Sequence, residues 1–160
     1  MKTYQGALVA VAATVVAVHA LTSAVLWLAV GDTVTTLVPG FADIHFVVNR
    51  GVSFGLFAQD SVLGKNILAA ATALLIAILA TWASRATRPL VGIGLGTIIG
   101  GALYNVADRV LYGGVFDFLA LRIGSVPLFV CNAADIAISV GVIILLLDAA
   151  RDNGTEKSKV

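Results

Sequence analysis

Residues 89–107 read PLVGIGLGTIIGGALYNVA, a run that contains no Asp, Glu, Lys or Arg. Two further stretches, 3–31 and 66–84, also lack these charged residues. A helix that crosses a lipid bilayer needs about 20 mostly apolar residues, and each stretch can supply one. A fourth apolar segment, 131–150, carries an acid near each end. The pattern therefore predicts four transmembrane helices.

The composition supports this fold class. Of the 160 residues, 59% are hydrophobic and 12% are charged, with a mean hydropathy of +1.01. A soluble domain is about half apolar and about a quarter charged. The chain is therefore expected to be an all-α membrane protein with one domain, residues 1–150, and a polar cytoplasmic tail, residues 151–160. The expected helices are 6–30, 63–84, 89–108 and 131–150.

The first apolar stretch is predicted to remain in the protein as a helix. It is longer than the roughly 7–15 apolar residues of a cleavable signal peptide, and no small-x-small site ends it. Basic residues gather at the N-terminus, the second connection and the tail: Lys2, Arg85, Arg88, Arg151, Lys157 and Lys159. Because basic residues mark the cytoplasmic side, both termini are expected inside and both longer loops outside. The net charge of +1 gives no reason to expect nucleic acid as a partner.

A small extracytoplasmic β element is predicted between the first two helices. Residues 44–48 are apolar and β-branched, which favours a strand, and residues 49–51 are typical of a turn. Residues 52–57 alternate apolar with small side chains and fit a second strand. The segment 110–130, between the third and fourth helices, is expected to be a loop.

The pattern Asn-x-x-Asp occurs twice, as Asn105 to Asp108 and as Asn132 to Asp135. Residues three apart share a helix face, so each Asn is expected to orient its own Asp. Both motifs fall at the outer end of a helix, and Asp117 lies between them in sequence. An acid at the edge of the hydrocarbon is costly and suggests a functional site. Two carboxylates brought together can share one proton and activate water.

Structural explanations exist for each acid taken singly. Asn132 is a good N-cap, and Asp135 in the first turn would complement the helix dipole. Asp108 could pair with Arg109 at a helix end, and Asp117 could be an ordinary loop acid. Their shared side of the membrane favours a site built on Asp117 and Asp135. The sequence shows no ligand cluster for a metal, and one cysteine excludes an internal disulfide.

Four segments together resemble the lipoprotein signal peptidases (signal peptidase II). They are NRGVSFG at 49–55, GGALYNVADRV at 100–110, GVFDF at 114–118 and NAADIAI at 132–138. Their order and spacing match that family over most of the chain. The resemblance implies a bacterial inner-membrane aspartic peptidase with four helices and no cofactor. It would act, as a monomer, on prolipoproteins whose cysteine already carries diacylglycerol, and the cyclic peptide globomycin would inhibit it.

The resemblance also assigns roles to residues. Asp117 and Asp135 match the catalytic pair. Supporting polar residues are matched by Asn105, Asp108, Arg109 and Asn132. A substrate-binding loop is matched by Asn49 and Gly51.

The chain departs from the family pattern at a few positions. His19 and Ser23 stand where the family has an Asp and a Lys, and a neutral hydrogen bond between them is expected instead. Tyr104 replaces a Gly, and Cys131 replaces a Phe. These changes leave open a divergent paralogue that binds lipoprotein or antibiotic without efficient turnover. A small transporter is a further alternative, which the clustering of the acids at one face disfavours.

Overall fold

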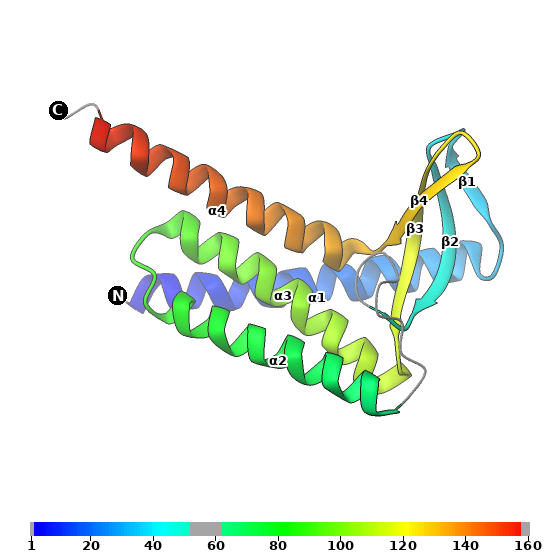
Figure 1. The fold of residues 1–160 in the computed structure, drawn as a ribbon, viewed down its shortest axis with the longest axis horizontal. Helices are drawn as coiled ribbons and strands as arrows, with labels where there is room; N and C mark the ends of the chain where they lie inside the picture. Colours follow the sequence, from blue (N-terminus) through cyan, green and yellow to red (C-terminus); the bar gives the residue numbers. More distant parts are fainter. Residues whose placement is uncertain (1, 52–61, 158–160) are drawn as a thin grey trace.

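The computed structural model describes residues 2–51 and 62–157, which form four helices and a four-stranded sheet. The helices are α1 (Lys2–Val30), α2 (Val62–Ser84), α3 (Pro89–Tyr112) and α4 (Ala133–Lys157). The strands are β1 (Thr35–Val38), β2 (Ala42–Asn49), β3 (Val115–Ile123) and β4 (Val126–Cys131). The sheet stands at one end of the helices, and both chain termini lie at the other end (Figure 1).

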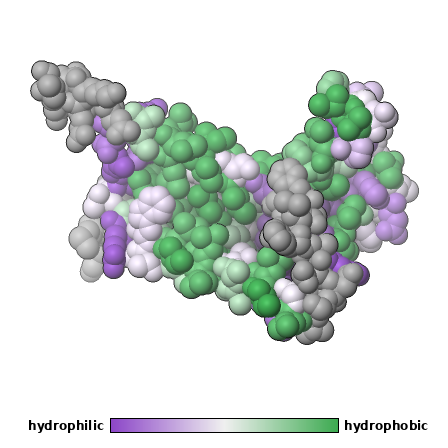
Figure 2. Space-filling view, viewed as in Figure 1, coloured by the Kyte–Doolittle hydropathy of each residue, from purple (hydrophilic) through white to green (hydrophobic). Residues whose placement is uncertain are grey.

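All four predicted membrane helices are confirmed. The apolar spans cover Gly6–Val30, Asn66–Ser84, Pro89–Tyr112 and Ala133–Asp152. Large hydrophobic side chains point outward from the helices, as Leu28 (86% exposed) and Leu63 (71% exposed) illustrate. Hydrophobic residues cover the helical part of the surface, and polar residues gather near the termini and around the sheet (Figure 2). An apolar exterior of this kind needs lipid around it, so the chain is a multi-pass membrane protein.

Helix α3 occupies the centre of the bundle because its glycines allow two neighbouring backbones to approach. A Cβ at Gly100 would lie 2.7 Å from the carbonyl oxygen of Ala12 in α1. A Cβ at Gly101 would lie 2.6 Å from the carbonyl oxygen of Ala134 in α4. Small residues permit such contacts in membranes, where van der Waals packing drives helix association. Since Ala134 precedes Asp135, this contact also sets the position of that acid.

Gly101→Ala is expected to destabilise the protein by about 1–3 kcal/mol, because the new methyl group would collide with α4. Gly92→Ala provides a matched control on the same helix, since nothing lies within 4 Å of a Cβ there. Removing a helical glycine without a clash stabilises a helix by up to about 1 kcal/mol. Thermal unfolding in detergent should therefore lower the Tm only for Gly101→Ala. Equal Tm values for the two variants would contradict this account of the α3–α4 contact.

Both long connections between helices contribute to the sheet. The strands are antiparallel in the order β1-β2-β3-β4. In the β2–β3 pair, Val47 lies opposite Asp117 and Asn49 lies opposite Val115. The sheet therefore joins the segment after α1 to the segment after α3, and Asp117 lies in one of its two central strands.

One prediction about the segments between the helices is wrong, and a second concerns residues outside those that the structure describes. The predicted loop at 110–130 is wrong, because it forms β3 and β4, joined by a turn in which Gly124 has a φ of 60°. The alternation of aromatic and aliphatic residues in VFDFLALRI suits a strand, as does its pairing on both edges. The β element is thus not confined to the first connection. The predicted strand at 52–57 lies outside the described residues.

The helix ends differ from prediction on α3 and α4. Helix α3 continues to Tyr112 and ends at Gly113, whose φ of 74° is the left-handed conformation common after a helix. Helix α4 continues beyond residue 150 to Lys157, so most of the expected tail is helical. Arg88 pairs with Asp148 at 2.9 Å and with Asp152 at 2.7 Å. These acids lie four residues apart on one face of α4, and their shared partner supports the extension.

Candidate active site

The fold brings the two predicted catalytic acids together at the junction of sheet and bundle. Asp117 comes from β3 and is only 1% exposed, whereas Asp135 is half-buried in the first turn of α4. Asn132 contacts both of them. Its side-chain Nδ2 donates to Oδ1 of Asp117 at 2.7 Å, and its main-chain N–H donates to Oδ2 of Asp135 at 3.2 Å. One buried residue therefore links the two carboxylates.

Two further asparagines complete the hydrogen-bond network around the acids. Nδ2 of Asn105 donates to Oδ1 of Asp135 at 2.9 Å, and its Oδ1 accepts from Nδ2 of Asn132 at 3.2 Å. Nδ2 of Asn49 donates to Oδ2 of Asp117 at 2.9 Å. The side-chain amides of Asn105 and Asn132 thus each donate to an acid outside their own Asn-x-x-Asp motif. The prediction that each Asn orients its own Asp is confirmed for Asn132, which hydrogen-bonds to Asp135. It is wrong for Asn105, whose amide bonds to Asp135 because α3 and α4 pack closely.

The N-cap interpretation of Asn132 is also confirmed. Its Oδ1 accepts from the main-chain N–H groups of Ala134 at 2.8 Å and Asp135 at 3.0 Å. The carboxylate of Asp135 in turn accepts a hydrogen bond from the main-chain N–H of Asn132, which completes a capping box. Structural and functional interpretations therefore coexist, because the oxygen caps the helix while the amide nitrogen holds Asp117.

Asp108 and Arg109 fix the backbone around the pair. Oδ2 of Asp108, which is 3% exposed, accepts from the N–H of Phe116 at 3.1 Å and anchors β3 one residue before Asp117. Arg109 donates to the carbonyl oxygens of Asn105 at 3.0 Å and Gly51 at 2.9 Å. The guanidinium thereby ties the end of β2 to α3. All the predicted supporting residues meet around Asp117 and Asp135.

The surroundings of Asp117 favour its protonated form. Burial raises the pKa of this carboxyl to about 6, and the nearby Asp135 charge raises it too. Hydrogen bonds from Asn49 and Asn132, together with the charge of Arg109, act in the opposite direction. A carboxyl whose pKa is raised toward neutrality beside a second carboxyl is the arrangement needed for acid–base work.

The raised pKa of Asp117 predicts a pH-dependent stability. Because the folded protein binds this proton more tightly than the unfolded chain, stability falls as the pH rises from about 4 to about 6. The change is at most about 3 kcal/mol. Asp117→Asn should remove this part of the pH dependence, as measured by Tm between pH 4 and pH 8. An unchanged slope in the variant would show that another group is responsible.

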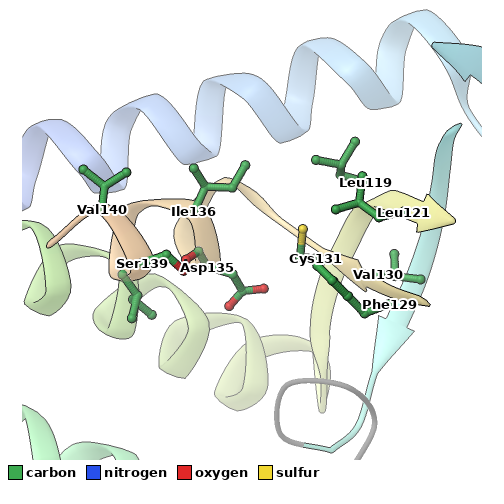
Figure 3. Close-up of a pocket in the computed structure, with 10 residues that line it drawn as sticks. Leu119, Leu121, Phe129, Val130, Cys131, Asp135, Ile136, Ser139 and Val140 are labelled. Carbon is green, nitrogen blue, oxygen red and sulfur yellow. Dashed lines mark hydrogen bonds between the residues drawn. The ribbon is translucent and has the colours of Figure 1, made fainter. Parts of the chain in front are cut away.

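An apolar cavity of about 450 Å³ adjoins Asp135 (Figure 3). Asp135 forms part of its wall, together with Leu121, Phe129, Cys131 and Ile136. Burial raises the pKa of the Cys131 thiol to about 11, and the charges of Asp135 and Asp117 act in the same direction. The thiol is therefore protonated at neutral pH and is a poor nucleophile. The cavity can accept an aliphatic group next to the acids.

The expected hydrogen bond between His19 and Ser23 is wrong. Both ring nitrogens of His19 are buried without a hydrogen-bond partner in the described part of the chain, and the Ser23 hydroxyl interacts with Tyr104 instead of His19. His19 instead packs on Tyr104, with ring centroids 3.7 Å apart and planes at 44°. Two departures from the family pattern are therefore neighbours in space. Their separation in sequence hid this contact, since no periodicity links residues on different helices.

The described residues contain no group of three or more His, Cys, Asp or Glu side chains that could hold a metal ion. The chemistry available at this site is that of paired carboxyls, three amides and one guanidinium.

Comparison with known proteins places this geometry in context. Residues 8–151 match a family model described as signal peptidase (SPase) II. A lipoprotein signal peptidase of Methylorubrum extorquens (strain PA1) is 47% identical over 131 residues, which is 79% of this chain and 76% of the relative. One of Caulobacter vibrioides is 46% identical over 114 residues, 69% of this chain and 67% of the relative. A bacterial membrane enzyme solved by the in meso method at 2.3 Å shares the fold, with a TM-score of 0.77 at 22% identity, covering 94% of this chain and 91% of that one.

Proposed function

The chain belongs to the signal peptidase II family, and from that premise we propose that Asp117 and Asp135 are the catalytic pair of an aspartic endopeptidase. Family membership supports the overall reaction, which is removal of the signal peptide from prolipoproteins. The observation that carries the catalytic assignment is the hydrogen-bond network around the acids. Three asparagine side chains hold the two carboxyls in one arrangement.

The mechanism follows from two carboxyls that share one proton. The ionised carboxylate takes a proton from a water molecule. The oxygen of that water attacks the scissile carbonyl carbon at the same time. The protonated carboxyl donates to the carbonyl oxygen as negative charge develops there. The tetrahedral intermediate then collapses, the peptide bond breaks, and the leaving amine receives the proton that the carboxylate took from the water. The proton on the carbonyl oxygen returns to the other carboxyl, so the pair again holds one proton. The two acids titrate as a pair, so the starting proton belongs to the pair and not to one residue.

The supporting residues keep this geometry fixed. Asn105 and Asn132 orient the carboxyls from the two helices, and Asn49 holds Asp117 from the sheet. Asp108 and Arg109 position the strand and the loop, and Gly51 receives the guanidinium hydrogen bond. Asn49, which ends β2, and Gly51, which follows it, are proposed to contribute to substrate binding.

The substrate is proposed to be a prolipoprotein whose cysteine carries diacylglycerol, cut on the amino side of that cysteine. Lipid chains that remain in the bilayer require a site near its surface, and the acids lie where the helices meet the sheet. The apolar cavity beside Asp135 offers space for an aliphatic part of the substrate. The protein is proposed to work as a monomer in the bacterial inner membrane, with both termini cytoplasmic and the acids near the outer face. Globomycin-type peptides would compete for this site.

Reconstitution tests the activity directly. The purified protein in liposomes should convert a diacylated prolipoprotein to a smaller product on a gel, and should leave the same precursor without diacylglycerol uncut. A metal chelator should not change the rate, because carboxyls supply the chemistry. If the Methylorubrum relative cleaves the precursor and this protein does not, the chain is a binding paralogue and the proposal fails.

A further inference from the structure

A second cavity lies between α1, α3 and the sheet, and the catalytic acids do not line it. Its volume is about 350 Å³. Aromatic side chains form two of its walls as edge-to-face pairs. Trp27 and Phe46 have ring centroids 5.2 Å apart, and Tyr112 and Phe116 have ring centroids 5.1 Å apart. A third wall is the Tyr104 ring, which packs against His19.

Among the residues that line this aromatic cavity, one is acidic. Asp108 lines it and is 3% exposed. One of its oxygens accepts from the N–H of Phe116, and a carboxylate has room for further donors. The neighbouring Arg109 directs its hydrogen bonds to main-chain carbonyls. Ser23 also lines this cavity, and its buried hydroxyl interacts with the Tyr104 side chain.

Aromatic faces around a carboxylate suit a positively charged ligand. The face of an aromatic ring attracts cations, and cages of such rings bind quaternary ammonium groups. A buried carboxylate is also stabilised by an opposite charge. Arg109 already places one positive charge near Asp108, and a cationic occupant would add a second on the cavity side, which an anionic or purely apolar occupant would not.

The position of the cavity indicates which kind of molecule would carry the positively charged group. Trp27 lies in the last turn of the span Gly6–Val30, and Tyr112 ends the span Pro89–Tyr112. Phe46 and Phe116 lie on the adjoining strands β2 and β3. The cavity is therefore at the level where aromatic residues meet lipid headgroups. We propose that it binds the ammonium headgroup of a zwitterionic membrane phospholipid.

Tryptophan fluorescence can measure this binding in the intact protein. The chain has two tryptophans, Trp27 and Trp82, so Trp82→Phe leaves only the one at the cavity. In a nonionic detergent, dihexanoylphosphocholine should change the Trp27 emission in a saturable way. Dihexanoylphosphoglycerol has the same chains without the ammonium group and should bind at least about tenfold more weakly. Equal responses to the two lipids would overturn the proposal.

Two variants test the residues that form the cavity. Asp108→Asn keeps the shape and should weaken phosphocholine binding about tenfold, since a charged partner is lost. Ser23→Lys should abolish binding, because its own ammonium group would occupy the cavity and pair with Asp108. Ser139→Lys makes the same change in the other cavity and should bind as the parent does.

Unchanged binding in Ser23→Lys would overturn the site. Tetramethylammonium ions that bind as tightly as the lipid would overturn the choice of a lipid as the ligand. The assay contains no prolipoprotein, so its failure would leave the proposed peptidase reaction unaffected.

Discussion

Asp117→Asn and Asp135→Asn are each expected to reduce prolipoprotein cleavage about a thousandfold, the size expected when a positioned acid or base is lost. Asparagine has nearly the same shape as aspartate but cannot accept the proton of the attacking water. At position 117 it also brings an amide group against two donors, Nδ2 of Asn49 and Nδ2 of Asn132. The measurement is the initial rate of the gel shift with diacylated prolipoprotein in liposomes.

A matched control separates the loss of a catalytic acid from the loss of any acid. Asp43 lies on β2 in the same sheet and pairs with Arg122 at 2.6 Å, away from the catalytic pair. This ion pair lowers the pKa of Asp43 and has no place in the mechanism. Asp43→Asn should therefore retain most of the parent rate. Full activity in either Asp117→Asn or Asp135→Asn would eliminate the proposed pair.

Asn132→Ala is expected to lose both activity and stability. Loss of the N-cap oxygen alone costs about 1 kcal/mol. Loss of the amide donor also leaves Oδ1 of Asp117 without its 2.7 Å hydrogen bond in a buried site. The residue is 0% exposed, so no water can easily replace that donor. We expect cleavage to fall about a hundredfold or more, as when an interaction that positions catalytic groups is removed.

Asn132→Asp distinguishes the two functions of this residue. Its carboxylate retains an oxygen for the N–H groups of Ala134 and Asp135, so the cap is preserved. It offers no amide donor and adds a third negative charge next to the pair. The Tm should therefore stay closer to the parent than in Asn132→Ala, while cleavage is still lost. Retained activity in Asn132→Asp would show that the amide donor to Asp117 is dispensable.

The helices and the clustering of the two acids were predictable from sequence for a simple physical reason. A membrane span requires a long uncharged run, and an acid placed at its end is conspicuous, as Asp135 is. Strands β3 and β4 were missed because Asp117 and Pro127 made their segment look like a loop. The sheet forms through pairing with β2, more than 60 residues away along the chain, and such long-range pairing leaves no local signal.

The partners of the asparagines were not predictable from spacing. Asn105 and Asp108 do lie on one face of a helix, yet the Asn105 amide bonds to Asp135 on α4. The short α3–α4 distance at Gly101 makes this exchange possible. The stacking of His19 on Tyr104 has a similar origin, because it depends on how closely α1 approaches α3. Sequence identified the polar residues of the site, and packing determined which of them bond to one another.

The exchange of hydrogen bonds between motifs has a consequence for biogenesis. Asp117 accepts hydrogen bonds from Asn49, at the end of β2, and from Asn132, at the start of α4. Asp135 accepts a hydrogen bond from Asn105 on α3. No stretch of the newly made chain can therefore assemble a competent carboxyl before the last helix enters the membrane. We therefore expect a chain that stops before α4 to lack proteolytic activity, because it lacks Asp135 and the segment that presents the Asn132 amide to Asp117.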